Sequence, residues 1–147
     1  MKTNKHSIWD FVSINQKRFQ ALANKVWSTP ETCYNEQLSM RAHVEELKYH
    51  EFSVKTGIAN IPTAVLGEYG KSGPTIAFLG EYDALAGLSQ KADQFRQVPI
   101  EKGGNGHGCG HNLLGSASMQ AAVALKNWLQ ESNLPGVVRY YGCPAEE

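Results

Sequence analysis

The sequence predicts an α/β fold in which helices pack on a mixed sheet, within a single domain of residues 1–147. Apolar residues recur at helical spacing before residue 50 and alternate with polar residues after residue 52. A helix-type pattern then separates two strand-type runs between residues 75 and 142. A strand, helix, strand order of this length is a crossover, which joins parallel neighbours in one sheet. The chain of 147 residues is long enough to bury one substantial core.

Two helices are expected in the first third of the chain. The first runs from about Ser7 to Trp27, where apolar residues from Ile8 to Val26 lie on one stripe. Pro30 lies in a turn that ends it. The second helix runs roughly from Asn35 to Tyr49, with its apolar residues partly in phase. The default role of such stripes is to form a core.

Three strands follow, at residues 52–56, 63–67 and 75–79. Turn-forming residues occupy positions 70–74, so we expect the second and third strands to pair as a hairpin. The third strand is an almost unbroken apolar run, which indicates burial on both faces.

The second half of the chain predicts a loop, a helix and a strand. Residues 87–106 are polar and without clear periodicity, as is typical of a loop. A third helix begins near Asn112, and its broad apolar surface indicates that it lies against a sheet. Residues 134–136 break that pattern, and residues 137–142 form the fourth strand.

Residues that commonly bind metals follow the third and fourth strands and precede the third helix. They are Glu81 and Asp83, then His107, Cys109 and His111 in a glycine-rich loop, and finally Glu146 and Glu147. In open α/β sheets the ligand site lies beyond the carboxyl ends of the strands, so connectivity brings these groups to one edge. Thiolate and imidazole suit zinc and its first-row neighbours, and an added carboxylate indicates a catalytic site.

Simpler interpretations remain open for each group taken alone. The carboxylates could solvate loop ends, the commonest role of acidic residues. The loop could be a glycine-rich turn with a small buried cysteine and two surface histidines. Thiol redox chemistry at Cys109 or Cys143 is the weakest alternative, because no resolving cysteine lies close in sequence. Convergence of all the groups favours the metal site.

Composition excludes several classes of partner. Fourteen basic and fourteen acidic side chains cancel, so no overall field attracts nucleic acid or an anionic membrane. We see neither a signal peptide nor a membrane span. Three cysteines are an odd and sparse set, which indicates reduced thiols. The expected location is the cytoplasm.

Three sequence blocks carry a family resemblance: FLGEYDALAGLSQ, GNGHGCGHNLLG and YGCPAEE. With the WSTPET turn at residues 27–32, they resemble the metal-dependent aminoacylase and carboxypeptidase family of amidohydrolases, nearest to the p-aminobenzoyl-glutamate hydrolase branch. The resemblance covers essentially the whole chain and implies the N-terminal portion of a zinc-exopeptidase-like catalytic domain.

The resemblance implies a role for each matched residue. Cys109, His111 and Glu147 are expected to bind metal, and Glu146 to act as the general base. Glu81 stands where relatives have a metal-binding histidine, and Asp83 where they have the aspartate that orients it. These two and His107 are therefore expected to bind weakly or to support the ligands.

The implied reaction is hydrolysis of an amide bond in an N-acyl or aminobenzoyl amino acid, a small molecule, with zinc or manganese as cofactor. Family members continue beyond the position of Glu147 with further ligands and a dimerisation domain, so we expect an incomplete site without independent activity. The alternative is a non-catalytic metal-binding fragment, or half of a split enzyme acting through a complementing chain. A homo-oligomer also remains open.

Overall fold

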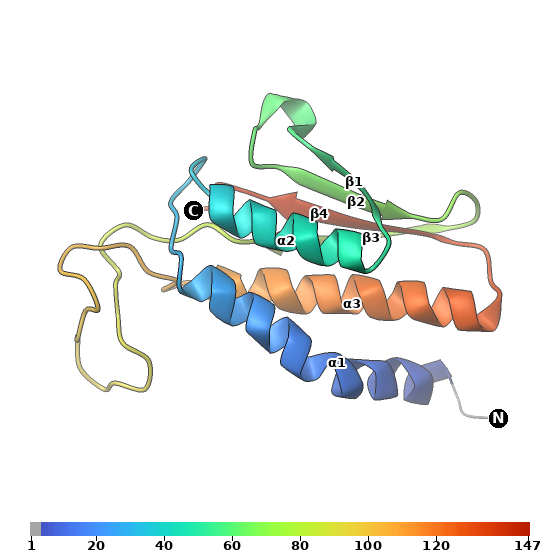
Figure 1. Ribbon diagram of the computed structural model, residues 1–147, viewed down its shortest axis with the longest axis horizontal. Helices are drawn as coiled ribbons and strands as arrows, with labels where there is room; N and C mark the ends of the chain where they lie inside the picture. Colours follow the sequence, from blue (N-terminus) through green and yellow to red (C-terminus); the bar gives the residue numbers. More distant parts are fainter. Residues whose placement is uncertain (1–3) are drawn as a thin grey trace.

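A computed structural model describes residues 4–147 and confirms the α/β prediction (Figure 1). Within this range lie three α-helices, four strands and a short 3₁₀ turn. In chain order they are α1 (Asn4–Trp27), α2 (Gln37–Tyr49), β1 (Ser53–Thr56), η1 (Ile58–Asn60), β2 (Val65–Tyr69), β3 (Thr75–Glu81), α3 (His111–Ser132) and β4 (Val137–Cys143). The predicted elements are therefore all present, with ends displaced by a few residues.

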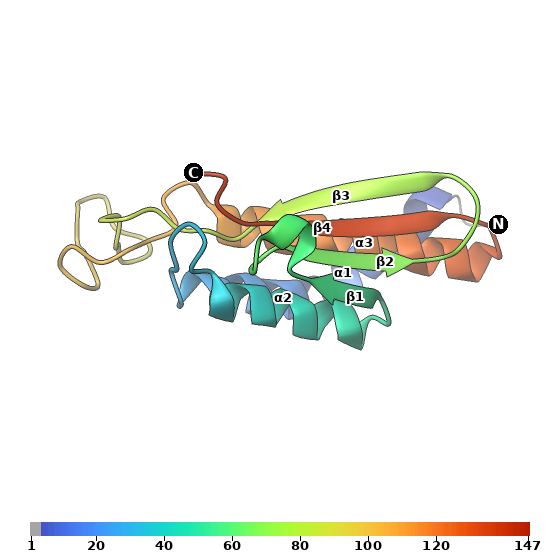
Figure 2. The same ribbon diagram turned by 90° about the horizontal axis from the view of Figure 1, so that it is seen from above.

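The four strands form one mixed sheet in the order β1-β2-β4-β3 (Figure 2). β3 and β4 are parallel, and Glu81 pairs with Cys143 at their carboxyl ends. β2 is antiparallel to both β1 and β4. The predicted crossover through α3 is thus confirmed.

The predicted hairpin between β2 and β3 is wrong, because β4 lies between them. Val138 pairs with Tyr69 of β2 on one side and with Ile76 of β3 on the other. The loop at residues 70–74 passes around the start of β4, where the Val137 N–H donates to the carbonyl of Pro74 at 2.9 Å. Turn residues predict a reversal of the chain but not the number of strands that the loop spans.

The predicted burial of β3 on both faces is also wrong. Ile76 is 48% exposed and Leu79 is 62% exposed. β3 is an edge strand whose covered face packs on α3, and in residues 4–147 nothing pairs with its outer edge. An apolar run therefore predicted the strand correctly but not its position in the sheet.

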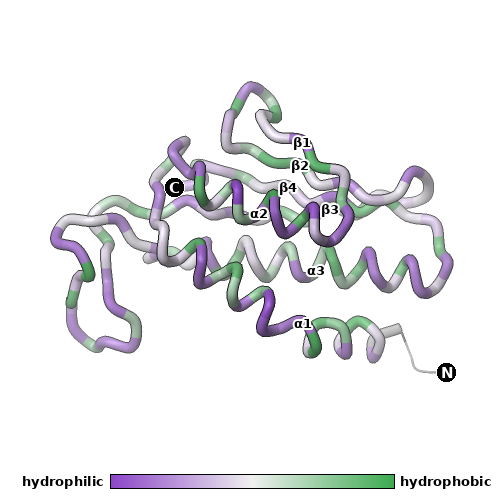
Figure 3. Tube along the Cα trace, in the orientation of Figure 1, coloured by the Kyte–Doolittle hydropathy of each residue, from purple (hydrophilic) through white to green (hydrophobic). Residues whose placement is uncertain are grey.

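The helices build the core against the sheet. α3 packs on β3 and β4, α2 packs on β1 and β2, and α1 packs on both helices. Hydrophilic and hydrophobic stretches alternate along the helices in Figure 3, as expected for helices with one buried stripe. The fully buried core residues include Val26, Leu47, Met119, Val138 and Tyr140.

None of the helices within residues 4–147 is both long and apolar enough to cross a membrane.

Gly115 lets α3 approach the end of β3. A Cβ atom at this position would lie 2.2 Å from the carbonyl oxygen of Glu81, closer than any side chain permits. Since Gly115 lies one helical turn after His111, this close packing fixes the start of α3 beside the carboxyl end of β3.

Candidate metal centre

The three predicted clusters meet at one end of the molecule. Figure 1 shows the chain's C-terminus and the start of α3 at the same end, opposite the start of α1. β3 ends at Glu81, β4 ends at Cys143, and α3 begins at His111. The carboxyl edge of the parallel strand pair therefore carries the candidate ligands, as expected for an open α/β sheet.

His111 is the centre of this cluster and is 3% exposed. Its Nδ1 atom lies 2.8 Å from Oδ1 of Asp83. Its Nε2 atom lies 3.1 Å from Glu81 Oε2, and 3.6 Å from one oxygen each of Glu146 and Glu147. Gly110, with φ of 89°, turns the loop sharply so that His111 becomes the first residue of α3.

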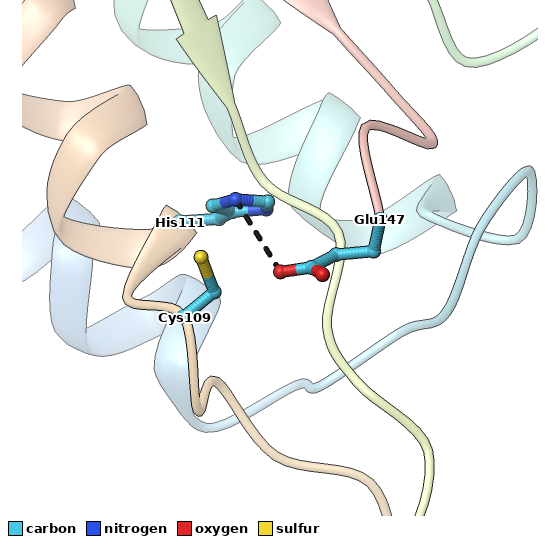
Figure 4. A group of neighbouring side chains, drawn as sticks. All are labelled: Cys109, His111 and Glu147. Atoms are coloured by element: carbon cyan, nitrogen blue, oxygen red, sulfur yellow. Dashed lines mark ion pairs between the residues drawn. The ribbon is translucent and has the colours of Figure 1, made fainter.

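Two sets of donor atoms are close enough to share an ion. Cys109, His111 and Glu147 form one set, and Glu81, His111 and Glu146 form the other. Within each set the donor atoms lie within 4.8 Å of one another. In Figure 4 the side chains of Cys109 and Glu147 both extend toward the imidazole of His111. A thiol, an imidazole and a carboxylate together match the donor types of a zinc-like divalent ion.

A bend after β4 brings the two final glutamates together. In an extended strand, neighbouring side chains point to opposite faces, so Glu146 and Glu147 could not both reach one partner. β4 ends at Cys143, before Pro144, which confirms the prediction that the strand stops short of these residues. Ala145 has φ of 56°, and this left-handed residue turns the chain so that both carboxylates approach His111.

The cluster is short of positive charge. Burial raises the pKa of Glu81, and the neighbouring carboxylates of Glu146, Asp83 and Glu147 add to this, although His111 opposes it. A hydrogen bond with Glu147, together with burial and nearby carboxylates, raises the pKa of the Cys109 thiol. The Glu81 carboxyl and the Cys109 thiol therefore resist ionisation, and a bound divalent cation would supply the missing positive charge. The residues therefore fit a divalent metal.

Asp83 holds two parts of the cluster at once. It is buried, and while Oδ1 faces His111, Oδ2 accepts the backbone N–H of Glu147 at 3.1 Å. Cys33 also reaches this point, with Sγ 3.8 Å from Oδ2 of Asp83 and 3.4 Å from the carbonyl of Glu147. Sequence reasoning missed Cys33, because an isolated cysteine in a turn carries no signal for a site.

His107 lies outside both donor sets. Its Nε2 atom lies 3.1 Å from the carbonyl of Val26, and burial lowers its pKa. It lines a cavity of about 500 Å³ beside Trp27, Leu88 and Ile100. His107 therefore lies against α1 and not among the candidate ligands.

Glu36 is, like Asp83, a buried carboxylate, but the sequence did not single it out. It is fully buried at the start of α2 and accepts the backbone N–H of Ala145 at 3.0 Å. The sequence places it before an apolar helical stripe, where an acidic residue is expected to be exposed. Its contact with residue 145 depends on the fold and has no local signature.

The chain is similar in sequence to parts of known hydrolases. No protein-family model matches the chain. The chain is 44% identical over 138 residues to one subunit of the p-aminobenzoyl-glutamate hydrolase of Escherichia coli, an alignment that covers 94% of this chain and 29% of that protein. The chain is thus homologous to part of that subunit. It is also 33% identical to a mouse Xaa-Arg dipeptidase, across 89% of this chain and 29% of the dipeptidase.

Solved structures share the fold of the chain. An aminobenzoyl-glutamate utilization protein from Klebsiella pneumoniae superposes with a TM-score of 0.64 at 13% identity, covering 95% of this chain and 39% of its own. A dinuclear metal-binding peptidase of the M20 family from Bacillus subtilis gives 0.62 at 22% identity, covering 90% and 36%. The chain therefore spans about 29% of the length of its curated relatives. The resemblance to metal-dependent aminoacylases and carboxypeptidases is confirmed for that portion.

Proposed function

We propose that this chain provides part of the metal centre of an amidohydrolase that cleaves the amide bond of an N-acyl or aminobenzoyl amino acid, such as p-aminobenzoyl-glutamate. The observation that carries the proposal is the convergence of Cys109, His111 and Glu147 within 4.8 Å. This convergence occurs in a chain 44% identical to part of a p-aminobenzoyl-glutamate hydrolase.

Each residue of the cluster has a distinct proposed role. Cys109, His111 and Glu147 hold a divalent ion, zinc or manganese, and Asp83 orients His111 through Nδ1. Glu81 belongs to the second donor set, which supports a role as an additional ligand. The Glu146 side chain is 54% exposed, against 21% for Glu81 and for Glu147, and this access to a substrate supports its role as the general base.

The chemistry follows from these roles. When bound, a divalent metal polarises a substrate carbonyl and acidifies water. Glu146 accepts a proton from the attacking water and returns it to the leaving nitrogen, so that the carbon–nitrogen bond breaks and a carboxylic acid and an amine form. The carboxylate of Glu146 is regenerated, and no redox partner is needed.

A complementing chain or a second copy is part of the proposal. The E. coli relative is one subunit of its hydrolase, which supports a second chain in the active assembly. β3 is an edge strand with Ile76 and Leu79 exposed, and an unpaired strand edge favours association with another strand. The alternative, a metal-binding module without catalysis, shares the same ligands and differs only in turnover.

The decisive experiment combines calorimetric titration of the chain with zinc and manganese and an amidase assay on p-aminobenzoyl-glutamate. We expect metal uptake that Cys109→Ser strongly weakens, and turnover that requires a complementing chain. Robust turnover by this chain alone would contradict the need for a partner. Unchanged metal uptake in Cys109→Ser would contradict the proposed centre, and metal uptake without turnover under any pairing would favour the binding module.

The cytoplasm is the proposed location. All three cysteines lie within the described residues and are free thiols, which supports a reducing compartment. Quantifying reactive thiols in protein purified under non-reducing conditions tests this, and an inter-chain disulfide in the native protein would contradict it.

A further inference from the structure

We infer that Glu36 is a positioning residue for the metal centre: its buried carboxylate fixes residues 144–147 so that Glu146 and Glu147 stay beside His111. Nothing in the sequence pattern assigns a role to Glu36, and it touches none of the candidate ligands' donor atoms directly. The inference rests on the proposed metal centre and adds the element that holds its C-terminal half in place.

The contacts of Glu36 join three separate segments of the chain. Its Oε1 atom accepts the backbone N–H groups of Tyr34 at 2.9 Å and of Ala145 at 3.0 Å. Its Oε2 atom accepts the hydroxyl of Thr63 at 2.9 Å. A fully buried carboxylate is costly unless hydrogen bonds compensate it, and bonds to a charged acceptor are among the stronger ones. The three donors therefore define one position for this side chain.

The residue that Glu36 holds is the one at which the chain bends. Ala145 has φ of 56°, an uncommon conformation for any residue with a side chain, so the surroundings must stabilise it. Glu36 binds the N–H of this residue, and Asp83 binds the N–H of Glu147 two residues later. The segment that carries both glutamates is thus held at two backbone points by two buried carboxylates.

Removing one of these points should loosen the ligands without dismantling the fold. With Glu36 truncated, the Ala145 N–H loses its acceptor, and the segment that brings Glu146 and Glu147 to 3.6 Å from His111 is held only through the N–H of Glu147. Residues that orient metal ligands without binding the metal typically contribute 10–100-fold in affinity. We therefore expect at least about a tenfold loss of zinc affinity in Glu36→Ala.

The test is calorimetric zinc titration of the chain as wild type, Glu36→Ala, Glu36→Gln and Glu31→Ala. Glutamine keeps an oxygen for both N–H groups, and its amide can donate to the Thr63 hydroxyl, so Glu36→Gln should retain affinity within about threefold. Glu31 is the matched control, because its carboxylate accepts the N–H groups of Leu38 and Ser39 and so caps the same helix. Glu31→Ala should destabilise α2 but leave zinc affinity within about twofold of wild type.

The outcomes separate the inference from the proposed function. Failure of the wild-type chain to bind zinc would overturn the proposed centre and the inference with it. Wild-type affinity in Glu36→Ala, or an equal loss in Glu31→Ala, would overturn the inference alone. Amide hydrogen exchange at Ala145, followed by NMR without metal, should accelerate in Glu36→Ala but not in Glu31→Ala, and unchanged exchange would also overturn it.

Discussion

The apolar core and the ligand edge of this molecule are organised by different interactions. The core between α1, α3 and β4 is built from side chains such as Met119 and Val138, which make no directional contacts and exclude water. The ligand edge is built from buried polar groups, Asp83, His111 and Glu36, each with specific partners. The core therefore supplies stability, and the edge supplies a fixed arrangement of donor atoms. Substitutions in the two regions should separate these two properties.

The largest expected effect is on stability and comes from the core. Met119 is fully buried in α3, so Met119→Ala should lower the free energy of unfolding by about 3 kcal/mol through lost burial and a cavity. Urea denaturation measures this, and zinc affinity of the folded protein should be unchanged. Leu113→Ala is the control on the same helix, because Leu113 is largely exposed. A comparable loss of unfolding free energy in Leu113→Ala would contradict the claim that the buried core side chains supply the stability.

The next effect should appear in metal binding alone. His111 belongs to both donor sets, so His111→Ala should weaken zinc binding by at least about a hundredfold, measured by calorimetry. His107→Ala is the matched control, since His107 lies in the same loop but contacts the carbonyl of Val26. If both variants lost the same affinity, the assignment of His111 as the central ligand would be wrong.

A pH titration of stability sharpens the comparison, because His43 is a titratable group inside the core. Burial lowers the pKa of His43 to about 3, against an ordinary value of 6.5. The unfolded chain therefore binds the proton more readily, and stability is greatest above pH 6.5 and is lost as the pH falls toward 3. We expect a loss of about 2 kcal/mol between pH 7 and pH 5.

The control for this titration is His43→Gln, which removes the titrating group. Its unfolding free energy should depend less on pH in the same interval, as measured by urea denaturation at each pH. A wild-type curve parallel to that of His43→Gln would show that His43 does not govern the pH dependence.

The smallest of these effects is expected at Asp83. In Asp83→Asn one oxygen still faces His111, but the amide group meets the N–H of Glu147, which it cannot accept. Zinc affinity should fall by about tenfold, since the proposed role of Asp83 is to orient ligands and not to bind the metal. Asp93→Asn, an exposed position in the loop before the candidate ligands, should have no effect. Equal affinities for Asp83→Asn and wild type would remove Asp83 from the proposed centre.

The same contrast explains what the sequence could predict. Core elements follow from periodicity, which is local, so all three helices and all four strands were predicted within a few residues. The convergence of Glu81, Cys109 and Glu147 was predictable because the strand–helix–strand connection determines where strand ends meet. The roles assigned to these residues came from the family resemblance and remain predictions.

What the sequence could not predict depends on contacts between distant residues. The hairpin prediction failed because β4, about 65 residues after the turn, enters the sheet between β2 and β3. Glu36 and Cys33 were missed because their partners near residue 145 and at Asp83 are far away in sequence. Polar contacts of this kind leave no periodic pattern, so they become visible only in the folded structure.

X-ray absorption spectroscopy of the zinc-loaded chain tests the central claim most directly. A centre formed by Cys109, His111 and Glu147 predicts one sulfur neighbour at about 2.3 Å and nitrogen or oxygen neighbours at about 2.0–2.2 Å. The sulfur signal should disappear in Cys109→Ser. A spectrum with only nitrogen and oxygen neighbours, or a sulfur signal that persists in Cys109→Ser, would contradict this centre.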